Sequence, residues 1–174
     1  MLKKNILLGL GLVLAGCGYQ LSPSPYSLLQ PLVVSVPVAA NQSRYGDLGP
    51  RLTREVIGRL DSSPNVTVRE TAPATLRLTI AEVSVSGGAW NPERNEYDLP
   101  TASASRVVNL TVEAGLEKTD GNGAVSARRL RVDSHRSYYV GDEEYQTQLL
   151  EEEAFNWVLA DLAQKVAQGL FAEF

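Results

Sequence analysis

The sequence is poor in the residues that most often carry catalysis and metal binding. It contains one cysteine, Cys17, and one histidine, His135, and it has no glycine-rich phosphate-binding loop. A single cysteine excludes an intramolecular disulfide, and no spacing of cysteine, histidine and acidic residues resembles a zinc site. Asp133 and Ser134 precede His135, but neighbours on a strand point to opposite faces and cannot assemble a catalytic triad. We therefore predict a protein that is not an enzyme and that holds no cofactor and no metal.

Long apolar runs and positive charge are also scarce. After Cys17, no stretch approaches the ~20 apolar residues with which a helix spans a bilayer. The chain has 20 acidic and 16 basic residues, which gives a net charge of −4 at pH 7. Non-specific binding of nucleic acid needs a basic field, so we expect no nucleic-acid partner.

The N-terminus has the pattern of an export signal. Lys3 and Lys4 precede an apolar run over residues 6–14. This run is too short to remain as a membrane span and is typical of a signal that is removed. The alternative, a cytosolic helix that happens to end in a cysteine, leaves the coincidence of charge, apolar length and small residues unexplained.

The end of this signal points to lipidation. The segment Leu14-Ala15-Gly16-Cys17 resembles the lipobox of bacterial lipoproteins, in which the cysteine is acylated and the signal is cut before it. We predict that residues 1–16 are a lipoprotein signal peptide and that Cys17 carries the acyl chains. The residue after the cysteine is Gly18 and not an aspartate. In enterobacterial lipoproteins this resembles the default signal for sorting to the outer membrane.

The rest of the chain predicts a lipidated tether over 17–31 and a single α+β domain over 32–174. The tether contains three prolines between Gly18 and Pro31 and reaches at most ~50 Å. In the domain, period-two and period-three-to-four apolar patterns alternate along the chain. They predict a two-layer sandwich in which two amphipathic helices cover a mixed four-stranded sheet, with one extra short strand as an option. The predicted strands are 32–38, 66–68, 74–86 (with a bulge near Ala81-Glu82), 106–116 and 124–140, with a hairpin turn at 120–123, and the predicted helices are 47–60 and 142–172.

Two regions are candidates for binding. The densest basic cluster comprises Arg128, Arg129, Arg131, His135 and Arg136, and alternate positions of a strand are able to present a cationic stripe to phosphates or sugar acids. The competing interpretation is a solvated sheet face, balanced by Asp133 and Glu113 across strands. The long excursion over 87–104 carries Trp90, Tyr97 and Leu99, which either form a partner-contact surface or fold back on the core.

Several motifs resemble one family. Cys17-Gly18-Tyr19-Gln20-Leu21 resembles the mature start of the lipopolysaccharide-assembly lipoproteins of the LptE family. The segment 34–45 resembles their first strand and the Asn-x-Thr/Ser-x-Tyr motif, with Ala39 and Ala40 where phenylalanine is common and Ser43 where threonine is common. Ala74 to Ile80 resembles an Ala-Asp-Leu-x-Leu-x-Ile strand with Thr75 in place of the acid, and Tyr138-Tyr139-Val140 also fits.

The resemblance implies a function at the outer membrane. LptE-type proteins sit as a plug inside a large LptD-type β-barrel and support the insertion of lipopolysaccharide into the outer leaflet. By this resemblance the protein is lipid-anchored and faces the periplasm and the barrel lumen. The residues expected to contact lipopolysaccharide are Arg106, Arg128, Arg129, Arg131 and Arg136.

A second class of protein shares several of these features. Lipoprotein regulators of periplasmic cell-wall synthases also combine a lipobox, a proline-rich tether and a small α+β domain. Their tethers are usually much longer, because they cross a wide gap. The 14 residues between Cys17 and the first predicted strand keep the domain near its membrane and favour the barrel partner. A small-ligand-binding lipoprotein has no support in the sequence beyond the missing catalytic residues.

Overall fold

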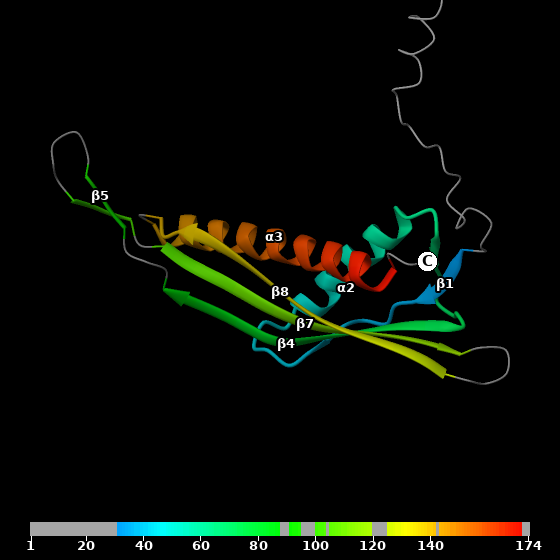
Figure 1. The fold of residues 1–174 in the computed structure, drawn as a ribbon. Coiled ribbons are helices and arrows are strands. Elements are labelled where there is room, and N and C mark those ends of the chain that lie inside the picture. Colours follow the sequence, from blue (N-terminus) through cyan, green and yellow to red (C-terminus); the bar gives the residue numbers. More distant parts are fainter. Residues whose placement is uncertain are drawn as a thin grey trace, which may run out of the picture.

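The computed structural model describes residues 31–87, 91–94, 100–103, 105–119, 125–141 and 143–171 (Figure 1). The long strands and both helices appear where the sequence predicts them. The elements in chain order are β1 (Leu32–Ser35), β2 (Ala40–Asn41), α2 (Leu48–Asp61), β3 (Val66–Val68), β4 (Ala74–Gly87), β5 (Asn91–Arg94), β6 (Pro100–Ser103), β7 (Ser105–Thr119), β8 (Val125–Tyr139) and α3 (Glu144–Phe171).

The main sheet is mixed, and its strands are in the order β3-β1-β4-β7-β8, with β2 paired to β4. Strand β1 runs parallel to β3 and to β4, whereas β4, β7 and β8 form a long antiparallel ladder. The pairing of β7 with β8 continues to Thr119 and Val125, on either side of the predicted hairpin turn, which lies outside the described residues. Strand β1 ends before Pro37, as expected for a residue that donates no ladder hydrogen bond.

The two-layer α+β prediction is confirmed, but the strand count differs. The sheet has six strands: the four predicted ones, the optional short strand predicted at 66–68, which is β3 beside β1, and the two-residue β2 beside β4. Two residues are too few to show a period, so sequence patterning does not detect β2. The predicted excursion over 87–104 contains β5 and β6, which pair only with each other. Both strands of such a pair are edges, where proline is tolerated.

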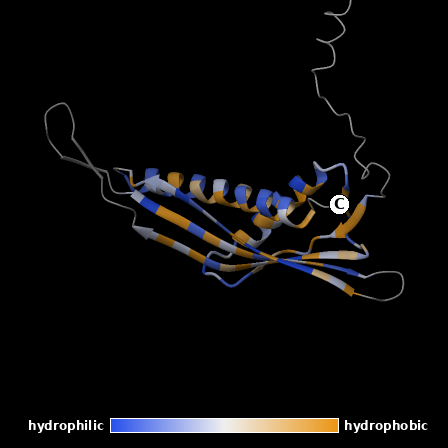
Figure 2. Ribbon diagram, viewed as in Figure 1, coloured by the Kyte–Doolittle hydropathy of each residue, from blue (hydrophilic) through white to orange (hydrophobic). Residues whose placement is uncertain are grey.

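Both helices lie on the same face of the main sheet (Figure 1). The face under them is built by alternation: positions 76, 78 and 80 of β4 and positions 108 to 116 of β7, every second residue, are buried. Figure 2 shows the resulting change from hydrophobic to hydrophilic residues along each long strand. Helix α3 supplies the other half of the core through Val158, Leu159, Leu162 and Val166. Neither described helix is both long and apolar enough to span a membrane.

The predicted bulge is present and preserves this arrangement. The register of β4 against β7 shifts between Ile80 and Glu82, with Ala81 as the extra residue. Beyond the shift, Val83 pairs with Leu110 and Val85 pairs with Val108. Leu110 and Val108 are buried. One extra residue thus returns the apolar positions of β4 to the face that the helices cover.

The segment just before β2 is tied to α2 by a buried side chain. The Thr53 hydroxyl accepts the Ala39 backbone N–H at 2.8 Å and donates to the Gly49 carbonyl at 3.0 Å. A Cβ on Gly49 would lie 2.6 Å from the Ala39 carbonyl oxygen, so the close approach of strand and helix requires glycine.

Arg51 joins the two helices at the surface. Its guanidinium contacts Asp47 of the α2 start at 2.8 Å and Glu152 of α3 at 2.7 Å, and it donates to Asn156 at 2.9 Å. The hydrogen bond from Arg51 is the main reason why the pKa of Asp47 lies below its ordinary value.

Candidate functional site

The predicted basic cluster on β8 is divided between the two faces of the sheet. Arg128 and Arg136 point to the helix-covered face: Arg128 donates to the Leu170 carbonyl oxygen at 3.4 Å, and the Arg136 guanidinium lies 4.9 Å from the centre of the Trp157 ring. Successive residues of a strand face opposite ways, so Arg129 points to the other side. The cluster therefore does not form one cationic stripe.

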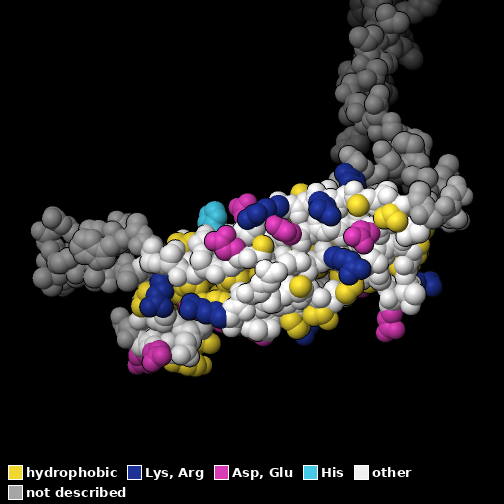
Figure 3. All heavy atoms as spheres, turned by 90° about the horizontal axis from the view of Figure 1, so that it is seen from below, with side chains coloured by type: hydrophobic (Ala, Val, Ile, Leu, Met, Phe, Trp, Pro, Cys, Tyr) yellow, Lys and Arg dark blue, Asp and Glu magenta, His cyan; other side chains and the backbone are white. Residues whose placement is uncertain are grey.

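The other basic residues of β8 lie on the open face of the sheet. Arg131 pairs with Glu113 of β7 at 3.5 Å, and both side chains are exposed. Arg129 lies opposite Gly115 and forms no ion pair with any described residue. Figure 3, seen from below Figure 1, shows acidic and basic side chains interspersed with one another and with small groups of hydrophobic side chains. The open face therefore matches the interpretation of a solvated surface on which charges are balanced across strands. Arg129 is the exception, because its cross-strand neighbour is Gly115 and not an acidic residue.

His135 takes no part in a catalytic arrangement. It lies exposed on the open face opposite Asn109, whereas Ser134 is buried on the helix side and donates to Asp161 at 2.6 Å. Burial of Asp161 acts to raise its pKa, but hydrogen bonds from Lys165 and Ser134 outweigh this and the pKa is lowered. Among the described residues, no group of three or more histidine, cysteine or acidic residues is arranged to hold a metal ion.

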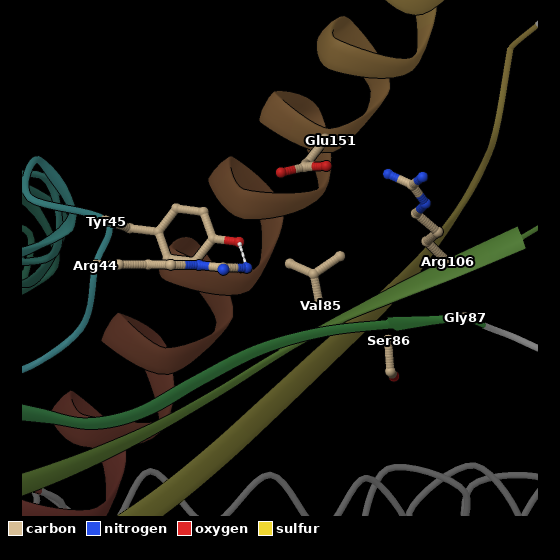
Figure 4. A pocket seen from close by; sticks show the side chains of 7 residues that line it. All are labelled: Arg44, Tyr45, Val85, Ser86, Gly87, Arg106 and Glu151. Carbon is tan, nitrogen blue, oxygen red and sulfur yellow. Dashed lines mark hydrogen bonds between the residues drawn. The ribbon is translucent and has the colours of Figure 1, made fainter.

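Arg106 belongs to a separate pocket at the end of the sheet, with a volume of about 410 Å³. The pocket lies where β4 and β7 meet α3 and the loop before α2, and Figure 4 shows the side chains around it. Two of them are guanidinium groups, Arg44 from the loop and Arg106 from β7, and one is a carboxylate, Glu151 from α3. The lining residues are Arg44, Tyr45, Val85, Ser86, Gly87, Arg106 and Glu151.

The loop side of this pocket is positioned by local hydrogen bonds. Asn41 Oδ1 accepts the Ser43 N–H at 2.9 Å, and the Ser43 hydroxyl accepts the Tyr45 N–H at 3.2 Å. These bonds turn the Tyr45 ring onto Phe155 of α3, at a centroid distance of 5.1 Å. Arg44 then donates to the Tyr45 hydroxyl at 3.2 Å. Arg44 was not among the residues predicted from the sequence. The feature that could have identified it is its place directly before Tyr45 in the segment 34–45, which resembles the LptE family.

The strand side of the pocket rests on a buried tyrosine. Tyr138 pairs with Arg106 across the ladder, and its hydroxyl donates to Glu151 Oε2 at 2.6 Å. Burial, followed by the hydrogen bond to Glu151, raises the pKa of Tyr138 to about 12. Tyr138 therefore holds the Glu151 carboxylate in place. With two arginines and one glutamate, the side chains that line the pocket carry a net charge of +1.

Replacing Tyr138 with phenylalanine should change how stability responds to alkaline pH. The raised pKa means that the folded state keeps the phenol proton better than the unfolded state, whose tyrosine titrates near 10. This stabilisation is fully present below pH 10 and is lost as pH rises toward 12, and it amounts to about 3 kcal/mol in total. The unfolding free energy of the wild type should thus fall more steeply than that of Tyr138→Phe in urea titrations between pH 9.5 and 11.5. Equal slopes would mean that the phenol titrates normally.

The remaining predicted residues lie outside the described part of the chain. These are Cys17 in the N-terminal segment and Trp90, Tyr97 and Leu99 in the excursion.

Two solved structures that share this fold carry lipoprotein names. Rare lipoprotein B from Shewanella oneidensis superposes with a TM-score of 0.55 at 17% identity, over 81% of this chain and 95% of that one. A lipoprotein from Caulobacter crescentus gives a TM-score of 0.52 at 15% identity, over 79% of this chain and 86% of that one. At these identities the likeness establishes the fold alone, that of a small two-layer α+β domain.

The family follows from the sequence profile. The profile of the LptE family, described as lipopolysaccharide-assembly, matches residues 33–173. The chain therefore belongs to the LptE family. No curated protein sequence matches it.

Membership confirms the predicted family and fold, and it assigns the chain to lipopolysaccharide assembly as an outer-membrane-associated lipoprotein. This is an assembly role and not an enzymatic one.

Proposed function

We propose that this protein is the lipid-anchored partner of an LptD-type outer-membrane β-barrel and lies with its domain in the barrel lumen. The observation that supports this most strongly is the open face of the long antiparallel ladder. Both helices cover the opposite face, and no described residue packs as a layer over the open one (Figure 1). The face is about 15 residues long, or ~50 Å.

The chemistry of this face suits a polar, water-filled enclosure. Its side chains alternate with the buried ones, and they are mostly hydroxyl, amide and charged groups. A face of this kind loses little by meeting the polar interior of a large barrel, whereas an apolar face would have to be buried against a hydrophobic partner. Its members include Thr75, Arg77, Thr79 and Ser84 of β4, Asn109, Thr111 and Glu113 of β7, and Arg129, Arg131 and Asp133 of β8.

The Arg44–Arg106 pocket is the proposed contact with lipopolysaccharide. The phosphates and sugar acids of lipopolysaccharide are anionic, and guanidinium groups bind phosphate and carboxylate oxygens through charge-assisted hydrogen bonds. Two arginines from different elements converge there beside a carboxylate that Tyr138 already binds. Of the five arginines that the family resemblance suggests, Arg106 has the most favourable position, since it is the one that shares a pocket with a second guanidinium, that of Arg44. Arg128, Arg131 and Arg136 contact groups of the protein itself, and Arg129 lies opposite Gly115 on the open face, outside this pocket.

The anchor completes the proposal. Residues 1–16 are the proposed signal, Cys17 the proposed lipid-bearing residue and 17–31 the proposed tether to a domain over 32–174. A reach of at most ~50 Å keeps the domain beside the membrane that holds the acyl chains. This suits a partner embedded in the same membrane.

A pull-down from native membranes tests the barrel partner. The tagged, full chain is isolated in mild detergent, and its partners are identified by mass spectrometry. We expect one large outer-membrane barrel protein, near one-to-one, that stays bound through washing. Recovery of the chain alone, or with a cell-wall synthase, would contradict the proposed partner.

Replacing Arg106 with glutamine should weaken lipopolysaccharide binding about tenfold. The variant removes one charged donor from the pocket, and hydrogen bonds to charged groups contribute about 1.5–3 kcal/mol. Binding of purified lipopolysaccharide to the full chain is measured by fluorescence titration. Arg54→Gln is the matched control, because Arg54 is an exposed arginine of α2 that does not line the pocket. An equal loss in both variants would show that only net charge matters.

A further inference from the structure

Strand β7 carries a glycine, Gly115, on the open face of the sheet (Figure 3). Its neighbours in the ladder are Arg77 of β4 on one side and Arg129 of β8 on the other. Adjacent strands lie ~4.8 Å apart, so the backbones of the two arginines are ~10 Å apart and no side chain stands between them. We call this place the Gly115 gap: it is one side chain wide and is flanked by two guanidinium groups.

The fold itself does not require glycine at this position. The register of β7 is continuous across Gly115 with both neighbouring strands, so no bulge lies there. A Cβ on Gly115 would have no atom within 4 Å, and the φ of this residue is not in the left-handed region. Glycine inside a strand lowers stability, and it often marks a place where another molecule approaches closely. The gap therefore points to a group from outside the domain that comes close to β7.

The charges around the gap are not balanced. Arg77 contacts Glu117 at 3.5 Å, and Arg131 contacts Glu113 at 3.5 Å, so both of these arginines have an acidic partner. Arg129 is exposed and forms no ion pair with a described residue. Three arginines and two glutamates give this part of the open face a net positive charge of one.

A single carboxylate matches both the charge and the width of the gap. One carboxylate neutralises the excess charge, and guanidinium groups bind its two oxygens in parallel. A phosphate ester carries about −1.5 to −2 near pH 7 and would leave the site net negative. It would also lie about 7 Å from Glu113 and Glu117, which are two residues from Gly115 along β7. The gap thus fits one aspartate or glutamate side chain.

A second copy of this chain is a poor source of that carboxylate. Two further acidic residues of the open face, Glu82 and Asp133, flank Thr111 in the ladder. If two copies stacked face to face with these acids on the arginines of the gap, Thr111 and not a carboxylate would cover the glycine. The same symmetric arrangement would set Glu113 against Glu113 and Arg131 against Arg131, and like charges that face each other are destabilising.

We propose that an aspartate or glutamate side chain on the inner wall of the partner barrel enters the Gly115 gap and binds Arg77 and Arg129. This inference rests on the proposed function, which places the open face against that wall. A charge-paired contact at one position of a polar interface fixes its register. The contact therefore sets where the ~50 Å open face is held along the lumen, and it does not involve the Arg44–Arg106 pocket.

Zero-length cross-linking tests this contact in the native complex. The full, lipidated chain carries Arg129→Lys, and native membranes are treated with a water-soluble carbodiimide, which joins an amine directly to a carboxylate that touches it. We expect a covalent product between this chain and the barrel protein. Mass spectrometry should locate the bond between the introduced lysine and an aspartate or glutamate of the barrel, and the wild-type chain should give no such bond.

Arg131→Lys is the matched control, because Arg131 lies on the same strand and the same face but already contacts Glu113. It should give an internal bond to Glu113 and little product with the barrel. If Arg129→Lys gave no product with a barrel that still purifies with it, the inference would be overturned and the proposed function would stand. A product between two copies of the chain would also overturn it. If no barrel purified with the wild-type chain, the proposed function would fail, and this inference with it.

Filling the gap gives an independent test. Gly115→Leu should lower the amount of barrel protein retained in the pull-down about tenfold, because its side chain keeps the carboxylate from the arginines. Thr111→Leu adds the same side chain to the same face, between Glu82 and Asp133, and should change retention little. Melting curves should show both variants folded, since a Cβ at 115 has room. Retention by Gly115→Leu equal to that of the wild type would overturn the inference, and so would a loss of lipopolysaccharide binding alone, which would assign the gap to a phosphate.

Discussion

Removing the lipid attachment should release the protein from the membrane. If residues 1–17 are replaced by a soluble-secretion signal with an Ala-x-Ala cleavage site, the exported chain begins at Gly18 and has no acceptor for acyl chains. Each buried methylene contributes about 0.8 kcal/mol, and two or three chains hold a protein on a membrane almost permanently. With the chain expressed above the level of its partner, we expect most of it to move from the membrane pellet to the soluble periplasmic fraction.

The control for this experiment retains Cys17 and the lipobox and exchanges residues 1–13 for the corresponding part of another lipoprotein signal. Metabolic labelling with an alkyne fatty acid should mark the control and not the variant. A variant that stays fully in the outer membrane without label would show that protein contacts, and not the lipid, retain it. Label on the variant would refute Cys17 as the acylated residue.

Truncating Leu162 should cost a large part of the stability of the domain. Leu162 lies on α3 against the sheet and is fully buried. Leu→Ala at such a site removes apolar contacts and leaves a cavity, at a cost of about 2–5 kcal/mol, against a typical total of about 5–15 kcal/mol. Urea denaturation of Leu162→Ala, followed by circular dichroism, should show a much lower midpoint with an unchanged slope.

Leu149→Ala is the matched control on the same helix. Leu149 is 52% exposed, so its truncation should change the unfolding free energy by less than about 1 kcal/mol. If the two variants lost equal stability, α3 would not be seated on the sheet through the Leu162 face.

The strands and helices were largely readable from the sequence because their signals are local. Alternation along 106–116 identified β7 and its buried face, and the break of that alternation near Ala81 located the bulge in β4. The helix patterns over 47–60 and 142–172 matched α2 and α3 within a few residues. Strand β2 was not readable, because two residues show no period and its pairing with β4 depends on where α2 packs.

The candidate site was readable only in part. Arg128 and Arg129 are neighbours in sequence but lie on opposite faces of the sheet, which the parity of their positions required. The apolar Leu130 and Val132 mark the covered face, so the sequence places Arg129 and Arg131 outward, as they are in the structure. Arg44 and Glu151 meet in one pocket although 107 residues separate them in the numbering, and no local pattern anticipates such a contact.

The sequence by itself determined the proposed export signal, the choice of strand or helix for each long segment, and the membership of the LptE family. These depend on charge order, apolar period and motif, which are properties of neighbouring residues. The tertiary structure decided the order of the strands in the sheet, which arginine lines a pocket and which strand forms an edge. These depend on how distant elements pack, and packing is set by the burial of apolar faces against one another over the whole chain.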